Sequence, residues 1–391
     1  EERFKRSKDW RRFDEERWLQ SYRNYRGLYG PDVQFTEAER SRVFIKVTKT
    51  KVLAAYGQIT DVLFARQKFP LSIEPTTLPE GVTEAVHFDP KTPPEQAEEQ
   101  EEASPYGFPG DGQDFEAGDT LNSLQEKKLN LGPLEEKLSD IEGLVEGEGL
   151  TPSAATFHPA MVAAKKMEKQ IMDQLEESGA SKHLRSSTFE CALFGTGIIK
   201  GPFAVDKEYA NWDENGEYSP TLKTVPQVKH VSCWDLYPDP DASNMDDASY
   251  IVERHKLSRP KLRELKDRPH FRKEAIDRCI EMGEVYSSQY WEDDLKDYYL
   301  NDHPERYEVL EYWGLMETDI AKEYGIDLPK EFKNIDQIQV NCWVCNNYVL
   351  RLVINPFKPA RIPYYAVPYE LNPYSFFGIG LAENMDDTQT L

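Results

Sequence analysis

The sequence has no long apolar run. No stretch approaches the roughly 18 consecutive apolar residues that a membrane-spanning helix needs. The N-terminal residues EERFKRSKDWRRFDEERW are too charged for a secretory signal peptide. We therefore expect a protein with no membrane contact that is not secreted by that route. Because the chain begins at Glu1 without a methionine and ends at Leu391 inside a helix-like pattern, we also expect it to be a fragment.

Cysteines are few and scattered. Cys191, Cys233, Cys279, Cys342 and Cys345 do not form the dense framework of a small oxidised domain, so we expect a reducing environment. Cys342 and Cys345 have the spacing of half a zinc site, but the sequence contains no second CxxC and no HxxxH pair. A redox motif would need the first cysteine at a helix N-terminus, and here both lie in a strand pattern. We therefore expect structural cysteines and no metal.

Positive charge is also in short supply. The sequence has 70 acidic and 47 basic residues and a formal net charge of -23, which is the wrong sign for a protein that grips phosphates by counterion release. The stretch from Pro79 to Leu150 alone contains 19 acidic and 4 basic residues. Its Pro, Gly, Glu and Gln content predicts a solvated insertion with one short helix at Leu121–Leu144. It is either a passive loop or an outward-facing surface that docks partners or repels DNA.

Motifs that would carry catalysis are missing. The glycines of GTGIIKG lack the spacing and the Lys-Ser/Thr ending of a P-loop. DPDASNMDD resembles a calcium loop, but Asn244 replaces its central glycine and Tyr250 its final glutamate, so we expect a turn. The seven histidines form no triad or metal pattern. We expect no enzyme, no cofactor and no metal. A metal-dependent nucleic-acid enzyme using Asp239, Asp241 and Asp246 is the rival interpretation.

Periodicity predicts an α+β protein without regular βαβ units. A helical stripe of Trp18, Tyr22, Tyr25 and Tyr29 indicates an N-terminal helix that docks through these aromatics. The stripe could contact a neighbouring subunit, with Trp18, Tyr22 and Tyr25 as candidates, or dock within the chain, and we weigh the two equally. Thr36 and Glu39 form a possible capping box for a second helix through Ile45–Leu63.

Strands are predicted in the C-terminal half of the chain. Three runs alternate or cluster β-branched and aromatic residues, as half-buried antiparallel strands do: residues 307–316, 337–344 and 348–354. Shorter strand-like runs are GTGIIKG, VKHVSCWDLY and SYIVERHKL. We expect a compact β-rich module over residues 301–376.

Taken in order, these landmarks resemble the portal (head-to-tail connector) proteins of short-tailed bacteriophages. The resemblance covers roughly residues 40–75 and 155–391. The helix that ends in a small-residue turn before a strand matches at Cys191, Ala192, Gly195, Gly197 and Gly201. The aromatic and Asp-Pro turn matches at Trp234, Tyr237, Pro238, Asp239 and Asp241. The aromatic and glycine corner before the channel helix matches at Pro363, Tyr374, Phe377, Gly378, Gly380 and Gln389.

The resemblance implies a portal fold with N-terminal wing helices (1–78), an α+β wing that approaches the stem (151–300), a β-rich clip (301–376) and the start of the stem helix (377–391). The acidic insertion (79–150) departs from the resemblance. It implies a dodecameric ring at the capsid vertex of the virion, assembled in the host cytoplasm. Its partners would be the terminase motor, capsid and scaffold proteins and tail adaptors. Double-stranded DNA would pass through during packaging and ejection without sequence-specific binding. The alternative is another virion structural protein, either a head-tail adaptor or a minor capsid protein.

Overall fold

The computed structural model describes residues 1–30, 43–64, 69–75, 86–87, 156–157, 159–212, 216–283, 286, 289–296, 306–326, 328–329, 332 and 335–390. The chain forms two compact units. One contains Glu1–Leu71 and Gln170–Leu391, and the other contains Ser72–Lys169. In the second unit, β1 (Val86–His87) pairs antiparallel with β2 (Thr156–Phe157), and α5 (Pro159–Glu177) begins. The rest of the predicted acidic insertion, including its short helix, lies outside the described residues, as does the predicted capping box at Thr36 and Glu39.

The first unit is built on two antiparallel sheets, which confirms the mixed α+β class. The larger sheet is a meander of five strands: β5 (Leu236–Pro238), β6 (Tyr250–Leu257), β7 (Tyr307–Glu317), β8 (Gln337–Cys345) and β9 (Tyr348–Ile354). The three long strands predicted from alternation are therefore present, with bounds within one residue. The predicted parts 151–300 and 301–376 share this sheet, because β6 pairs with β7 along its whole length.

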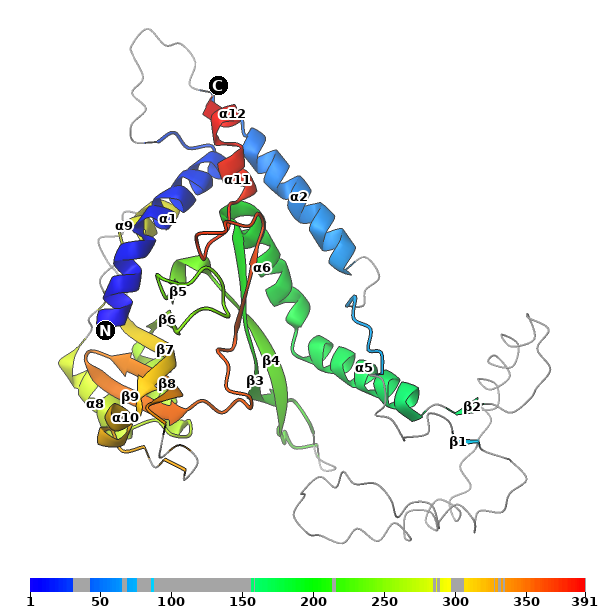
Figure 1. Cartoon of the computed structure of the whole chain (residues 1–391), viewed down its shortest axis with the longest axis vertical. Helices are drawn as coiled ribbons and strands as arrows, with labels where there is room; N and C mark the ends of the chain where they lie inside the picture. Colours follow the sequence, from blue (N-terminus) through cyan, green and yellow to red (C-terminus); the bar gives the residue numbers. More distant parts are fainter. Residues whose placement is uncertain are drawn as a thin grey trace. The chain divides into compact units, whose positions relative to one another are not determined.

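The smaller sheet has three strands, in the order β10 (Tyr364–Pro368), β3 (Thr196–Tyr209) and β4 (Thr221–Val231). β3 and β4 form a long hairpin that extends away from the helices above it (Figure 1). The run VKHVSCWDLY, which the sequence suggested as one strand, is divided between β4, a 3-10 turn at Cys233–Asp235 and β5. The chain therefore turns from one sheet into the other at Trp234.

Helices cover these sheets and frame the C-terminal residues. The long ones are α1 (Glu2–Arg26), α2 (Val47–Phe64) and α6 (Ala180–Phe194). Short helices are α7 (Arg259–Glu264), α8 (Lys273–Met282), α9 (Tyr290–Lys296), α10 (Thr318–Glu323), α11 (Leu381–Asn384) and α12 (Asp386–Thr390). Figure 1 shows α11 and α12 where α1 and α2 approach each other. No helix in the described part of the chain is long and apolar enough to cross a membrane.

The main core is aromatic and lies under α1. Trp18 is 1% exposed and packs edge-on against Trp234, with ring centroids 5.1 Å apart, and against Phe377 at 4.8 Å. A buried arginine ties the same helix to the chain reversal between the sheets. The Arg11 guanidinium donates to the carbonyls of Cys233 (3.1 Å), Trp234 (3.0 Å) and Leu236 (2.6 Å), and to the Glu15 carboxylate. The helix ends at Gly27, which has the left-handed backbone (φ 76°) that favours glycine.

Trp18 is thus covered by residues of its own chain, which is the intrachain docking weighed in the sequence analysis. Tyr22 and Tyr25 are half-buried on the same helix. The Tyr22 hydroxyl donates to the Leu295 carbonyl at 3.1 Å. The Tyr25 ring packs edge-on against Phe189 of α6 at 5.8 Å. Both retain some exposed surface, and their contact with another subunit stays a prediction.

Candidate functional site

Two of the glycine-containing segments that carry the resemblance meet in space. Gly195 ends α6 with φ 93°, and a Cβ built on it would lie 2.5 Å from the Gly378 carbonyl oxygen and 2.6 Å from the Gly380 nitrogen. A Cβ on Gly380 would lie 2.6 Å from the Leu193 carbonyl oxygen. The Gly378 amide also donates to the Thr196 hydroxyl at 2.9 Å. Backbones that approach this closely leave no room for any side chain, so glycine is required on both sides.

The aromatic residues of the resemblance flank this glycine junction. Phe377 is fully buried beside Trp18, and Trp234 packs against Phe194 with ring centroids 5.6 Å apart. Tyr237 is fully buried between Phe4 (4.6 Å, edge-on) and the Arg11 guanidinium, whose carbon lies 3.7 Å from its ring centre. These contacts join segments that are more than a hundred residues apart in the sequence into one packed centre.

The other residues of the resemblance are spread around this centre. The Pro363 carbonyl accepts a bond from the Gly201 amide at 2.9 Å. Tyr374 is 93% exposed and does not join the core. The Gln389 side-chain oxygen accepts bonds from the amide and hydroxyl of Thr48, both at 3.1 Å, and its amide group donates to the Ile45 carbonyl. Gln389 therefore fastens α12 to the start of α2.

The DPDASNMDD segment is a turn held by its own side chains. β5 ends at Pro238, and the buried Asp239 carboxylate accepts the Asp241 amide at 3.3 Å. Asp241 forms an exposed ion pair with Arg6 at 2.6 Å. The Asp246 amide bonds to the Asn244 side-chain oxygen at 2.8 Å. Within the described part of the chain, Asp239, Asp241 and Asp246 do not come together as a set of three metal ligands.

A charged cluster that the sequence analysis did not single out lies buried where the two sheets meet. The Lys200 ammonium, from β3, is 2.7 Å from Glu253 Oε2 on β6 and 2.5 Å from Glu311 Oε2 on β7. Tyr364 of β10 donates to Glu253 at 2.7 Å, and His255 bonds to Glu311 at 2.8 Å. We call Lys200, Glu253, His255, Glu311 and Tyr364 the inter-sheet cluster. It bonds the three-stranded sheet to the five-stranded sheet with charged groups.

Further donors complete the environment of Glu311. Its second oxygen accepts the Trp313 indole at 2.7 Å and the Asn341 amide at 3.3 Å. The His255 ring stacks on Trp343 with centroids 5.0 Å apart. A buried carboxylate with this many donors is well satisfied, which is the condition for keeping such a group inside a protein.

Burial and ion pairing shift the pKa values of these groups in opposite directions. Burial raises the pKa of Glu311, but the Lys200 ammonium and His255 outweigh it, so its pKa lies well below the usual range. The pKa of Glu253 is lowered by the same balance of burial against Lys200 and His255. Burial lowers the pKa of Lys200, and the two carboxylates more than reverse this. Lys200 and both glutamates are therefore charged at neutral pH.

Glu253, His255 and Glu311 are the one group of potential metal ligands among the residues that the structure describes. A divalent cation would have to displace the Lys200 ammonium, which already lies against both carboxylates at hydrogen-bond distance. The Lys200 ammonium therefore already takes the place that a metal ion would have between these carboxylates. The arrangement fits an internal ion-pair network better than a metal site.

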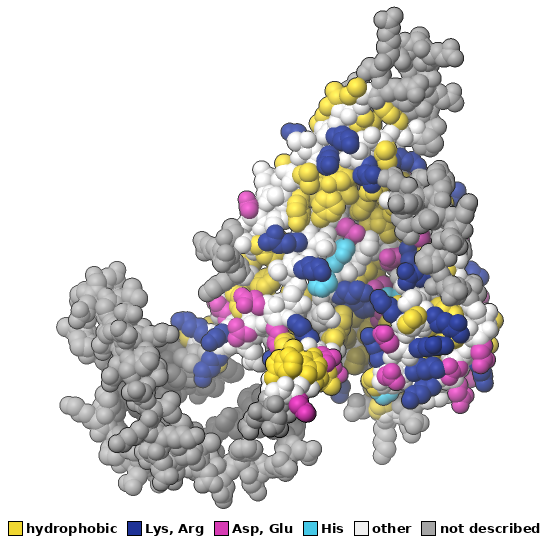
Figure 2. All heavy atoms as spheres, turned by 180° about the vertical axis from the view of Figure 1, so that it is seen from behind, with side chains coloured by type: hydrophobic (Ala, Val, Ile, Leu, Met, Phe, Trp, Pro, Cys, Tyr) yellow, Lys and Arg dark blue, Asp and Glu magenta, His cyan; other side chains and the backbone are white. Residues whose placement is uncertain are grey.

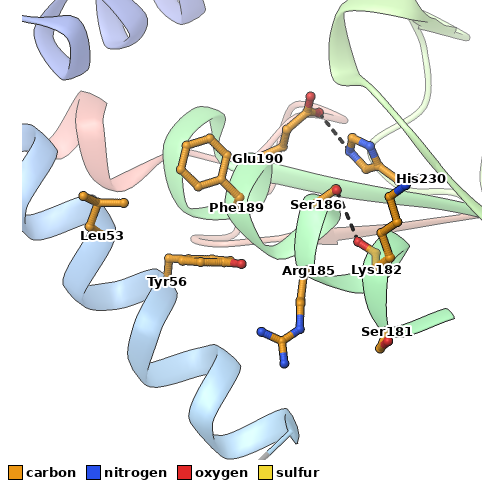
Figure 3. A pocket seen from close by; sticks show the side chains of 9 residues that line it. All are labelled: Leu53, Tyr56, Ser181, Lys182, Arg185, Ser186, Phe189, Glu190 and His230. Atoms are coloured by element: carbon orange, nitrogen blue, oxygen red, sulfur yellow. Dashed lines mark hydrogen bonds and ion pairs between the residues drawn. The ribbon is translucent and has the colours of Figure 1, made fainter. Parts of the chain in front are cut away.

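A groove lies between α2 and α6 (Figure 3). It has a volume of about 700 Å³, with Leu53 and Tyr56 of α2 on one side and Lys182, Arg185 and Phe189 of α6 on the other. Glu190, at its inner end, is paired with His230 at 3.4 Å and accepts bonds from Ser232 and Cys233. Figure 2 shows a face where exposed apolar patches are bordered by lysine and arginine side chains. The groove is thus lined by both apolar and cationic side chains.

The sequence contained one indirect signal of the inter-sheet cluster. Lys200 is the single charge in the apolar run GTGIIKG, and Glu253 and Glu311 lie in the strand runs SYIVERHKL and YEVLEYW, which contain further charged residues. A charge on a strand buried on both faces needs a partner, but the partner cannot be assigned without the sheet order.

Comparison with known protein families finds no match to this sequence, and no curated protein matches it significantly.

Proposed function

We propose that this chain is a subunit of a bacteriophage portal ring, the structure at one capsid vertex through which DNA enters and leaves. The observation that carries the proposal is the glycine junction. Gly195, Gly378 and Gly380 carry the resemblance to portal proteins by their order along the sequence, and they also lie against one another in the fold. If these glycines matched the family pattern only by chance, they would not be expected to contact one another in the fold.

The arrangement of the last helices supports the same proposal. The Arg17 guanidinium of α1 binds the Glu383 carboxylate of α11 with two bonds, at 3.0 and 2.7 Å. The Asn24 side chain donates to Asp386 of α12, and Gln389 binds Thr48 as described above. The direction of α12 is therefore set by α1 and α2, as a helix at the start of a channel wall would require.

The charge of the chain is compatible with a conduit for DNA. A strongly basic wall would hold phosphates with a salt-dependent grip and resist sliding. Most of the acidic excess lies between Pro79 and Leu150, so the argument rests on the smaller negative charge of the remaining chain. In the proposed ring, the subunit does not hydrolyse nucleotide. The terminase motor would supply the work, and capsid, scaffold and tail adaptor proteins would bind the ring's outer surfaces.

The test is whether the purified chain forms closed rings. Negative-stain images averaged along the symmetry axis should show an annulus with a central hole, and native mass spectrometry should give one dominant oligomer near twelve copies. Images without any closed annulus would favour an adaptor or a minor capsid protein instead. Magnesium-dependent nuclease or ATPase activity, lost on Asp239→Asn together with Asp241→Asn, would favour the enzyme interpretation.

A further inference from the structure

The end of the β3–β4 hairpin is an exposed apolar element. Trp212 and Tyr218 form a bridge across the hairpin, with their rings edge-on at 5.5 Å. Trp212 is 65% exposed, Tyr218 is 54% exposed and Leu222 is 72% exposed. We call these three residues the hairpin tip. Large aromatic side chains that stand together in solvent are typical of a surface that another protein covers.

The charge at the hairpin tip is acidic. The two lysines nearest the tip in the sequence, Lys207 and Lys223, are both bonded to Glu177 of α5. Glu208 and Glu217, one on each side of the hairpin, are both exposed. The hairpin tip therefore combines an apolar surface with negative charge.

The groove between α2 and α6 has the opposite character. Its apolar lining is Leu53, Tyr56 and Phe189, and the exposed Lys182 and Arg185 also line it. Neither cation has an acidic partner among the residues described. Its volume of about 700 Å³ lies within the range of about 300–1,000 Å³ found for sites that enclose a ligand or a few side chains.

The hairpin tip of a chain cannot fill the groove of the same chain. β4 begins at Thr221, beside the tip, and His230, which lines the groove, is close to its other end. Nine residues of extended strand separate these points by about 30 Å. A contact between the two surfaces therefore needs a second copy. Because the surfaces differ, each copy would offer a tip to one neighbour and a groove to the other.

We propose that the hairpin tip of one copy inserts into the groove between α2 and α6 of the next copy. Trp212 and Tyr218 pack on Tyr56 and Phe189, and the acidic residues of the hairpin face Lys182 and Arg185. The proposal rests on the proposed ring, since a head-to-tail contact of this kind closes into a ring when its rotation divides a full turn. It adds which two surfaces of the chain meet.

Crosslinking between copies tests the contact directly. The full chain carrying both Ser181→Cys, at the groove, and Ser219→Cys, next to Tyr218, keeps the proposed apolar contacts and, treated with a short bismaleimide, should give a ladder of covalent oligomers on a denaturing gel. Each single variant should stay at the level of the unmodified chain. All five native cysteines are buried, so they should not react in the folded protein. Rings that form normally but give no ladder would overturn the proposal while leaving the proposed ring intact.

Charge reversal is the second arm. Lys182→Glu with Arg185→Glu should raise the concentration needed for assembly about tenfold, as expected for losing two charge pairs. The matched control, Lys165→Glu with Lys166→Glu, makes the same charge change at exposed positions of α5 and should assemble as the unmodified chain does. Adding Glu208→Lys and Glu217→Lys to the groove variant should restore assembly. Equal assembly of groove and control variants would refute the contact.

The two arms separate this inference from the proposed function. A crosslinked ladder without any closed ring in images would support the contact and reject the portal ring. Rings without a ladder would do the reverse. A chain that stays monomeric at all concentrations and gives no ladder would reject both.

Discussion

Replacement of Lys200 by methionine should destabilise the fold more than the loss of any exposed charge. Lys200 has 9% of its side chain exposed, and its two partners, Glu253 and Glu311, have 4% each. Methionine keeps most of the aliphatic length but leaves two buried carboxylates facing each other without their shared cation. Removing one member of a buried ion pair typically costs about 3–5 kcal/mol. We expect a loss in that range.

Guanidinium unfolding followed by tryptophan fluorescence measures this loss. The matched control is Lys223→Met, because Lys223 of β4 forms an ion pair with Glu177 of α5 and has 59% of its side chain exposed. Exposed pairs contribute about 0–1 kcal/mol. If Lys200→Met loses no more than Lys223→Met does, then the inter-sheet cluster does not hold the sheets together, and the reasoning is refuted.

Two further measurements show whether the unpaired carboxylates cause the loss of stability in Lys200→Met. Adding Glu253→Gln and Glu311→Gln to Lys200→Met removes the unpaired carboxylates, so part of the lost stability should return. The deficit of Lys200→Met should also depend on pH. In the unmodified chain the pKa of Glu311 is lowered, so its contribution is present above its unfolded value and is lost as pH falls through the folded value. Without Lys200, burial raises the pKa of both carboxyls, so the deficit should be largest near pH 7 and smaller at pH 4.

Three other substitutions test the core. Gly195→Ala would place a Cβ 2.5 Å from a backbone oxygen at φ 93° and should cost more than about 2 kcal/mol in denaturant unfolding, whereas Gly57→Ala, with open space around it, should not destabilise. Trp18→Ala should cost about 3–5 kcal/mol, whereas Phe13→Ala on the same helix, 72% exposed, should change stability little. Burial raises the pKa of Asp14 to about 6, so its stabilising contribution is present below pH 4 and is lost as pH rises through 6. Asp14→Asn should flatten that part of the stability curve, and an unchanged curve would contradict the assignment.

Alternation along the chain predicted the strands that have one clear buried face. In β7, Tyr307, Val309, Glu311 and Trp313 are buried in turn, and the run 307–316 was predicted from this pattern. The charge at Glu311 did not disturb the prediction, because the remaining positions keep the period of two. Local pattern was sufficient for β7, β8 and β9, whereas β10 was not predicted although its Tyr364 is buried.

The hairpin was harder to predict because its outer half is mostly exposed and is held to the rest of the unit by polar bonds, from Lys207, Tyr209 and Lys223 to Glu177. The first four residues of β4, Thr221–Thr224, are all exposed, and Pro226 lies inside the strand. Such residues have no apolar period to detect. Their order comes from pairing with β3, which continues to Tyr209. The sequence suggested strands only at the inner end, in GTGIIKG and in the start of VKHVSCWDLY, so the hairpin tip was not predicted.

The inter-sheet cluster depends on contacts that no local pattern carries. Lys200 and Glu253 are 53 residues apart in the sequence, and Lys200 and Glu311 are 111 apart. The separation places them on three different strands of two sheets. Until the strand order is known, each is a charge in a strand run with no assigned partner. The burial of each charged residue can be inferred from the apolar residues around it in the strand, but its ion-pair partner cannot.

The position of Trp18 changes what a ring-assembly experiment can show. Trp18 packs on Trp234 and Phe377, and Phe377 immediately precedes Gly378 of the glycine junction. Its helix also holds α11 through Arg17 and Glu383. Loss of Trp18 would therefore disturb the direction of the last helices even if no other subunit touches it.

Failure of a Trp18 and Tyr22 double serine variant to form rings would then be consistent with both a subunit contact and intrachain docking. A Tyr22→Ser variant separates them better, since Tyr22 is half-buried and removing it should leave the aromatic core intact. Normal unfolding with loss of rings would assign Tyr22 to the subunit boundary, and normal unfolding with intact rings would assign it to its own chain.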